Sequence, residues 1–112
     1  MKRKYAPERA DIVWLSFDPQ SGHEQAGRRP AVVVSPRKYN EKVGLGLFCP
    51  ITNTRKSYPF EVEIPEGSPI SGAVLSDQLK SLDWRARDAQ FIARLPAAVM
   101  ASILAKIRTL TA

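Results

Sequence analysis

The chain is poor in the residues that build metal centres and covalent cross-links. Its 112 residues include one cysteine, Cys49, and one histidine, His23. This pair cannot supply the usual zinc ligands, and the carboxylates lack the spacing of a calcium loop, so we expect no metal and no cofactor. A lone cysteine forms no internal disulfide. Cys49 lies in an apolar run and is interpreted as a buried small side chain in a reducing compartment.

Long apolar segments and glycine-rich phosphate loops are also missing. No run is long enough to span a bilayer, and the basic residues 2–4 are not followed by the apolar stretch of a signal peptide. We therefore expect a cytoplasmic protein that does not bind membranes. Walker and dinucleotide-binding fingerprints do not occur. The length suits one modest core, so we expect a single domain over residues 1–112.

Acidic residues are too few to balance the basic ones in the first half of the chain only. Residues 1–56 hold 11 Lys and Arg against 5 Asp and Glu, whereas residues 57–112 hold 6 against 6. The whole net charge of +6 thus lies in one half. A localised basic surface attracts polyanions such as nucleic acids, although a merely solubilising face is the alternative.

Alternating apolar residues and turn residues predict a mainly β fold. The expected strands are 11–17, 31–35, 45–51, 60–64, 73–75, 78–82 and 90–94. In the first of them both faces are apolar, which favours burial on both sides. After Pro96 the apolar residues recur with helical spacing, so one amphipathic helix is expected at the C-terminus. Five to seven short antiparallel strands and one terminal helix indicate a small, strongly curved barrel.

The most informative segment runs from Gly22 to Pro36. A polar loop ends in Arg28 and Arg29, and an apolar strand follows directly. Pro30 biases Arg29 toward one extended conformation, so its guanidinium is presented at the rim of a sheet. A Ser/His/Asp triad would have to use His23 and is not favoured.

Cleavage of RNA suits these residues, because the ribose 2′-hydroxyl can serve as the nucleophile without a metal ion. The protein must then accept a proton, stabilise a phosphorane and protonate the leaving oxygen. Arg29 matches phosphate oxygens bidentately and stays protonated, which suits charge stabilisation and not the role of base. With one histidine, the chain cannot use a two-histidine mechanism within one subunit.

The segments Asp11–Pro19, Gly22–Pro36 and Cys49–Thr54 together resemble the MazF/PemK family of toxin endoribonucleases. The resemblance extends from about Tyr5 to Leu110. It implies an SH3-like antiparallel barrel with a C-terminal helix, of the kind shared with the CcdB toxins. It also implies a metal-independent endoribonuclease that cuts single-stranded RNA at a short sequence and leaves a 2′,3′-cyclic phosphate and a 5′-hydroxyl.

The resemblance assigns catalytic roles to Arg29 and Thr52. From the residues alone, the cap of a turn is the better explanation of Thr52. Glu24 is a candidate general base, or else an ion-pair partner that orients Arg28 or Arg29. The further residues expected to contact RNA are Gln25, Arg28, Asn53, Thr54, Arg55, Lys56, Asp77 and Gln78.

As partners, the resemblance implies single-stranded RNA, a second copy of the chain in a homodimer, and a MazE-like antitoxin with an acidic tail. The alternative is a non-enzymatic, CcdB-like toxin that binds gyrase through its C-terminal helix. Such a protein needs neither the Glu24–Pro30 loop nor Thr52. A basic RNA-binding barrel without catalysis is the third possibility, which an intact Arg29 and Thr52 disfavour.

Overall fold

The structure is a computed structural model that describes residues 4–17, 27–54 and 57–112. In chain order, its strands and helices are β1 Asp11–Phe17, β2 Gly27–Val33, α1 Arg37–Val43, β3 Gly46–Thr52, β4 Glu61–Glu63, β5 Ala73–Leu75, β6 Lys80–Leu82, β7 Gln90–Arg94 and α2 Ala97–Thr111. The prediction of a mainly β chain with a C-terminal helix is confirmed. Neither helix in the described part is long and apolar enough to cross a membrane.

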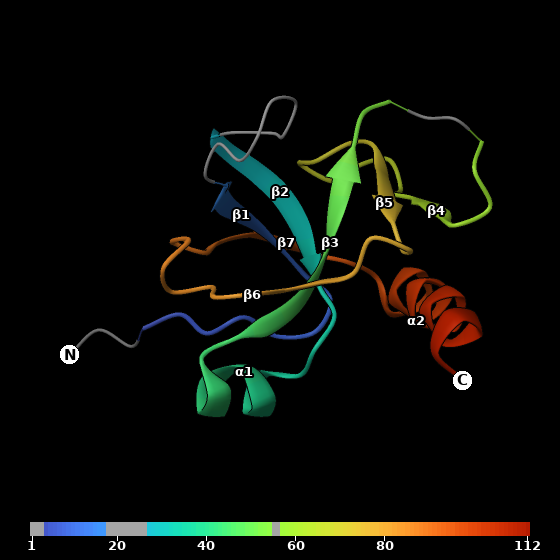
Figure 1. Cartoon of the computed structure of the whole chain (residues 1–112). Coiled ribbons are helices and arrows are strands. Elements are labelled where there is room, and N and C mark those ends of the chain that lie inside the picture. Colours follow the sequence, from blue (N-terminus) through green and yellow to red (C-terminus); the bar gives the residue numbers. More distant parts are fainter. Residues whose placement is uncertain (1–3, 18–26, 55–56) are drawn as a thin grey trace.

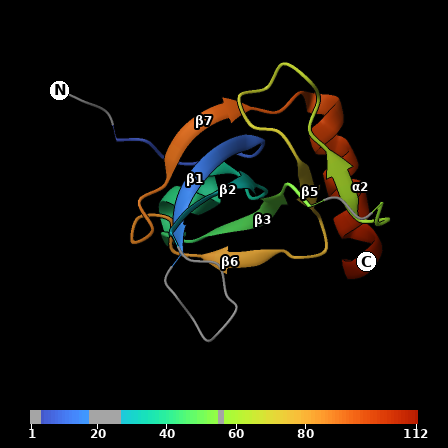
Figure 2. The ribbon, with the colours of Figure 1, turned by 90° about the horizontal axis from the view of Figure 1, so that it is seen from above.

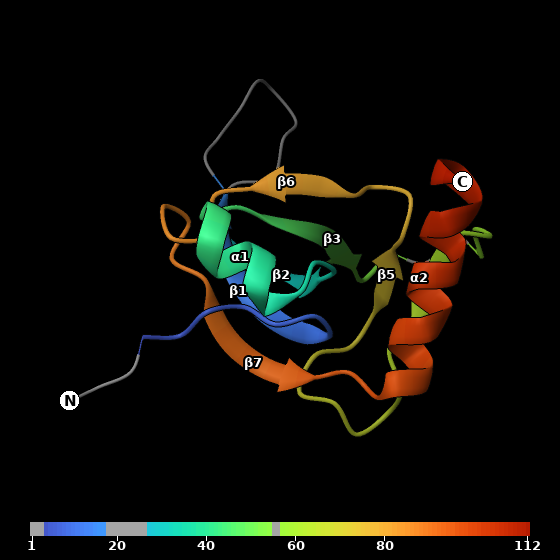
Figure 3. The same cartoon turned by 90° about the horizontal axis from the view of Figure 1, so that it is seen from below.

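The strands form one antiparallel sheet in the order β4-β5-β3-β2-β1-β7 (Figure 1). The second edge of β3 is shared, because β5 pairs with its C-terminal end and β6 with its N-terminal end. In Figures 2 and 3, β6 and β7 lie on opposite sides of the central strands, and α2 lies beside β5. Within the described residues the sheet curves strongly but does not close, and α2 contacts β4 at one end of it.

The central strands β1, β2 and β3 are buried on both faces. On one side Ile12, Val32 and Cys49 join a core that also contains Met100 and Ile103 of α2. On the other side, a second core consists of Ala6, Val13, Leu15, Ala31, Val33, Phe48 and Trp84. The expected burial of both faces of residues 11–17 is thus confirmed for the apolar residues 12, 13 and 15.

The second strand begins at Gly27, four residues before the predicted start at Ala31. Proline is normally excluded from central strands because it has no N–H to donate to the neighbouring strand. Here Pro30 pairs with Trp14 of β1, but the ladder between β2 and β3 ends one residue later, at Ala31 and Pro50. No partner on the β3 side requires a donor from Pro30. The arginines 28 and 29 therefore lie within the strand.

Helix α1 was missed because residues 37–43 show no apolar periodicity. A signal was nevertheless present, since proline before a helix and glycine after it are typical ends. Pro36 is the N-cap, and Gly44 is the C-cap in the left-handed conformation, with φ of 82°.

A hydrogen-bonded cluster around Asn40 anchors α1. The Asn40 side chain is fully buried; its amide donates to Pro7 O at 2.8 Å and Ser35 O at 3.1 Å, and its Oδ1 accepts from Ser35 Oγ at 2.6 Å. Ser35 Oγ also accepts from the N–H of Leu47, and Asn40 O accepts from Trp84 Nε1. Because tertiary hydrogen bonds hold this short helix, a search for apolar spacing could not find it.

Candidate functional site

The start of β2 and the end of β3 bring Arg29 and Thr52 to the same end of the sheet. The last paired positions of these antiparallel strands are Ala31 and Pro50. Arg29 lies two residues before Ala31, and Thr52 lies two residues after Pro50. Because side chains alternate along a strand, Arg29 and Thr52 belong to the same face. Beyond the last pair the strands diverge, as Figure 1 shows.

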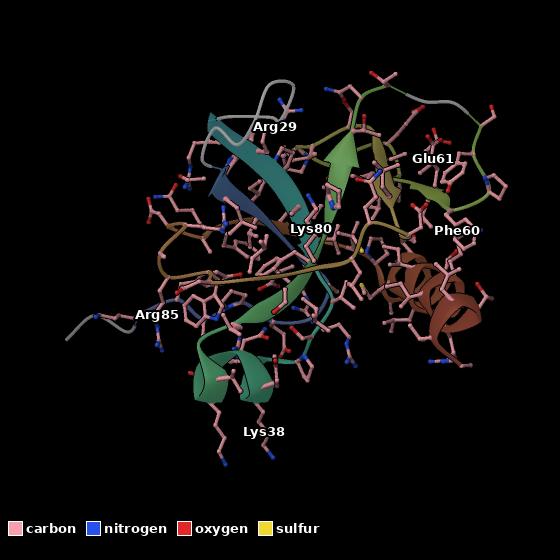
Figure 4. The ribbon with its side chains drawn as sticks, viewed as in Figure 1. Arg29, Lys38, Phe60, Glu61, Lys80 and Arg85 are labelled. Carbon is pink, nitrogen blue, oxygen red and sulfur yellow. The ribbon has the colours of Figure 1, made fainter. Side chains whose placement is uncertain are left out.

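Arg29 is held by its backbone and not by its guanidinium. Arg29 pairs with Leu15 of β1 and is half-buried. Among the described residues, no hydrogen bond or ion pair of its side chain is present. Figure 4 shows Arg29 at the end of β2 that lies away from α1. A fixed backbone with a guanidinium not bonded to described residues is suited to a phosphate ligand.

Thr52 closes a turn and still retains a free donor. Its Oγ1 accepts a hydrogen bond from the N–H of Thr54 at 3.1 Å. The turn-cap interpretation is therefore correct, but accepting this bond leaves the hydroxyl proton available to a ligand. Gly72 fixes the position of Thr52, because a Cβ there would overlap the carbonyl oxygen of Thr52, and its φ of 126° favours glycine.

Arg28 differs from its neighbour because its guanidinium is tied to the protein. Nη1 donates to Ser16 Oγ at 2.8 Å and to the carbonyl of Arg87 at 3.1 Å, and it lies 3.7 Å from a carboxylate oxygen of Asp88. Nη2 is buried and has no partner among the described residues. Arg28 thus joins β1 and β2 to the turn before β7. Its contact with RNA remains a prediction.

A pocket of about 430 Å³ lies next to Thr52. Its lining residues are Thr52, Thr54, Tyr58, Glu61, Leu75, Asp77 and Gln78. Four of the residues predicted from the sequence are therefore gathered at one surface, although they come from segments 25 positions apart. Figure 4 shows Glu61 on the opposite side of the β3 tip from Arg29. Arg29 does not line the pocket itself.

Asp77 is the best-defined acidic group of this pocket. Its Oδ2 accepts a short hydrogen bond from the hydroxyl of Tyr58, which raises the pKa of Tyr58 above its ordinary value of 10.0. Its Oδ1 is buried without a partner among the described residues. Burial, and secondarily the charge of Asp77, raises the pKa of Cys49 to about 12. Cys49 is thus an inert, buried thiol, as expected.

Not every predicted residue can be placed. Glu24, Gln25, Arg55 and Lys56 lie outside the described residues, as does His23. Asn53 is exposed beside the pocket but does not line it.

Three pocket residues, Tyr58, Glu61 and Leu75, were not predicted. Two sequence features could have indicated them. Glu61 has an outward position in an alternating strand, and Tyr58 precedes Pro59 and Phe60 in a turn.

The described part of the pocket offers polar and acidic groups but no metal site. No three His, Cys, Asp or Glu residues cluster there or elsewhere in the described ranges. The arrangement combines a guanidinium for phosphate, a hydroxyl donor and a partly apolar pocket with an acceptor for N–H groups. These are the elements that bind a single-stranded nucleic acid with exposed bases.

Comparison with known proteins gives a consistent result. Residues 8–111 match the family model of the PemK-like, MazF-like toxins of type II toxin–antitoxin systems. The endoribonuclease toxin MazF of Escherichia coli K12 is 51% identical over 89 residues, which are 80% of this chain and 79% of that protein. The Escherichia coli endoribonuclease PemK is 32% identical, over 98% of this chain and 86% of that protein.

Solved structures agree with this result. The crystal structure of MazF from Deinococcus radiodurans is 49% identical and superposes with a TM-score of 0.88, covering 96% of this chain and 98% of that one. A MazE–MazF complex from the same organism is 44% identical, with a TM-score of 0.87 over 96% of this chain and 97% of that one. With this fold, the paired strand ends and a family match over nearly its whole length, the chain belongs to the PemK-like, MazF-like toxin family of type II toxin–antitoxin systems.

Proposed function

We propose that the protein is the toxin of a toxin–antitoxin pair and a sequence-specific endoribonuclease that cleaves single-stranded RNA without a metal ion. The observation that carries the proposal is the strand register, which puts Arg29 and Thr52 on one face at one end of the sheet. Thr52 also lines a pocket large enough for a nucleobase. The family match and the curated relatives, all named endoribonucleases, support this activity.

In the proposed mechanism the 2′-hydroxyl of the substrate attacks the adjacent phosphorus. Arg29 binds two phosphate oxygens and stabilises their growing negative charge. Thr52 donates its hydroxyl proton as a hydrogen bond to a non-bridging oxygen. Glu24 is the proposed general base and takes the proton of the 2′-hydroxyl. The bond between phosphorus and the 5′-oxygen breaks, and the leaving 5′-oxygen takes a proton from water, so that a 2′,3′-cyclic phosphate and a 5′-hydroxyl are formed.

Binding of RNA divides into two parts in this proposal. The arginines and lysines around residues 28–29 and 55–56 hold phosphates, which gives affinity without sequence preference. The pocket beside Asp77 and Gln78 holds an unstacked base, whose edge meets the carboxylate and the amide. RNA is usually read through splayed bases in this way.

The proposed assembly is a homodimer regulated by an acidic, disordered antitoxin segment in the cytoplasm. Large apolar side chains such as Phe91 and Leu110 are 51% and 56% exposed in the isolated chain. Solved structures of similar chains include MazE–MazF complexes. The basic half of the chain attracts both RNA and an acidic segment, so the two ligands should compete. Displacement of labelled RNA by the antitoxin peptide, at two salt concentrations, tests this competition.

The gyrase-binding alternative receives no support. The curated relatives are named endoribonucleases, and the chain carries both the Arg29 segment and Thr52, which a CcdB-like binder does not need. The C-terminal helix α2 buries Met100 and Ile103 in the core.

The decisive experiment is incubation of the purified protein with a long defined RNA in EDTA. We expect cuts at one short sequence, with cyclic phosphate and 5′-hydroxyl ends. The matched control is Arg29→Ala, which should cut at least about 10²-fold more slowly. Loss of cleavage in EDTA would contradict metal independence, and 3′-hydroxyl products would contradict attack by the 2′-hydroxyl.

A further inference from the structure

The hydroxyl of Tyr58 occupies an acceptor in the pocket that a substrate could use. The Tyr58 residue is 42% exposed, and its hydroxyl forms an exposed hydrogen bond. It donates to Oδ2 of Asp77, across the pocket that also contains Thr52 and Gln78. An exposed phenol gains little from such a bond in water, because water offers the same partners. The contact matters more to Asp77 than to Tyr58.

Asp77 has fewer hydrogen bonds than a carboxylate can accept. Two carboxylate oxygens offer about four acceptor positions. Tyr58 fills one on Oδ2, and Oδ1 is buried without a partner among the described residues. If Tyr58 moved away, Oδ2 would face the pocket as a charged acceptor, and an N–H donor entering there would form a charge-assisted hydrogen bond.

The backbone around Tyr58 is fixed, so only the side chain has to move. The carbonyl of Tyr58 accepts from the N–H of Glu61 at 3.0 Å, and Lys106 of α2 donates to Pro59 O at 2.7 Å. The N–H of Ser76 donates to Phe60 O at 3.0 Å, which joins the Tyr58 segment to the Asp77 turn. Rotation about two side-chain bonds is enough to uncover Asp77. Rotamer changes of exposed side chains are fast compared with binding.

We propose that the Tyr58 hydroxyl is a placeholder for the exocyclic amino group of a nucleobase. In the RNA-free protein it keeps Oδ2 of Asp77 hydrogen-bonded, and on binding an amino group of the base takes over that oxygen. An amino base, such as adenine at N6 or cytosine at N4, can replace the phenol. A base that presents a carbonyl oxygen at this position cannot. This inference rests on the proposed function, since it assigns RNA to the pocket.

The placeholder lowers the apparent affinity for RNA. Each binding event must first break the Tyr58–Asp77 bond, so part of the new hydrogen bond replaces an old one. Removing the hydroxyl while keeping the ring should therefore tighten RNA binding. The gain should appear only for RNA with an amino base at this position, because a carbonyl base never replaces the phenol.

The test uses Tyr58→Phe and a short RNA that spans the mapped cut site, made non-cleavable by a 2′-deoxyribose at the scissile position. Fluorescence anisotropy should show binding about three- to tenfold tighter than that of the wild type, the size of one net hydrogen bond. RNAs in which single adenosines become inosine, or cytidines uridine, should include one whose affinity Tyr58→Phe leaves unchanged. In an Asp77→Ala background, which removes the acceptor, Tyr58→Phe should have no effect.

Tyr39→Phe is the matched control, since Tyr39 is 40% exposed on α1, outside the pocket. It should not change RNA binding. Weaker binding by Tyr58→Phe, or equal tightening for amino and carbonyl RNAs, would overturn the inference. So would an unchanged affinity for every RNA.

A second measurement needs no RNA and separates this inference from the proposed function. Ultraviolet titration of the three tyrosines, with Tyr58→Phe as the difference, should place the ionisation of Tyr58 above pH 10. Asp77→Asn should return it toward the ordinary value. If the titration behaves so but the wild type neither binds nor cleaves RNA, the proposed function fails. If the wild type cleaves RNA but Tyr58 titrates at its ordinary pH, the inference fails alone.

Discussion

The two ends of the sheet differ in whether their buried polar side-chain atoms have hydrogen-bond partners. At the α1 end, the side chains of Ser35 and Asn40 are buried and hydrogen-bonded throughout. At the Thr52 end, Ser76 Oγ, Asp77 Oδ1 and Arg28 Nη2 are buried without partners, and these three are all such side-chain atoms in the described part of the chain. In the described part of the chain, the buried side-chain atoms without partners therefore lie at the Thr52 end, whereas Ser35 and Asn40 at the α1 end have theirs.

This difference separates groups that hold the fold from groups left for a ligand. A buried polar atom without a partner costs about 1–3 kcal/mol. Such a cost persists where it serves binding, because the ligand then supplies the missing partner. The comparison predicts that mutations at the α1 end change stability, whereas those at the Thr52 end change activity.

The largest effect is expected for Asn40→Ala, which removes the three hydrogen bonds that its side chain forms with Pro7 O, Ser35 O and Ser35 Oγ. We expect the free energy of unfolding to fall by about 3 kcal/mol, measured by urea denaturation. Cleavage per folded molecule should stay near the wild-type value. The matched control is Asn53→Ala, at an exposed asparagine beside the pocket, which should leave stability unchanged. An equal loss of unfolding free energy in Asn40→Ala and Asn53→Ala would contradict the difference between the two ends of the sheet.

The reverse behaviour is expected for Arg29→Ala and Thr52→Ala. Each should reduce the cleavage rate by about 10²-fold or more, while the denaturation midpoint stays close to that of the wild type. Arg29→Lys should recover only part of the rate, because an ammonium lacks the bidentate fork. A folded Arg29→Ala protein with wild-type turnover would remove Arg29 from the site.

Two buried serines sharpen the comparison within one residue type. Ser35→Ala should destabilise the protein by about 2 kcal/mol, because Ser35 Oγ bonds both Asn40 and the N–H of Leu47. Ser76→Ala should be neutral or slightly stabilising. The Ser76 residue is only 1% exposed, and its hydroxyl has no hydrogen-bond partner among the described residues. Thermal denaturation of both variants measures the difference. A large loss for Ser76→Ala would show that its hydroxyl is satisfied after all.

The smallest effect concerns pH at the α1 end. The N–H of Arg37, and less strongly that of Arg9, donates to Glu8 and lowers the pKa of Glu8 below its usual 4.5. This contribution to stability is present above pH 4.5 and is lost as the pH falls through the lowered pKa. Glu8→Gln should therefore flatten the acid side of the stability profile. An unchanged slope between pH 5 and pH 3, in the same profile, would contradict this role.

The sequence predicted the elements whose signal is local. The strands 11–17, 73–75 and 90–94 have the predicted bounds, and the helical spacing after Pro96 corresponds to α2. Arg29, Thr52, Asp77 and Gln78 could be named because family motifs surround them. Their proximity depends on strand register, which no short motif contains.

The remaining features depend on contacts between distant segments. Helix α1 is held by Asn40 through partners at Pro7 and Trp84, so its own seven residues carry little apolar pattern. Tyr58 reaches Asp77 across 19 positions of sequence. Neither contact leaves a periodic trace in the chain, which is why the placeholder could not be predicted.

The prolines at positions 30 and 50, and not the neighbouring loops, determine how far apart the ends of β2 and β3 lie. Pairing between β2 and β3 stops at Ala31 and Pro50, because neither proline has an N–H for the next backbone hydrogen bond. The two proline rings thus set the separation of Arg29 and Thr52, and no side-chain contact is needed for it. Loop sequences on either side can diverge while Arg29 and Thr52 keep their spacing.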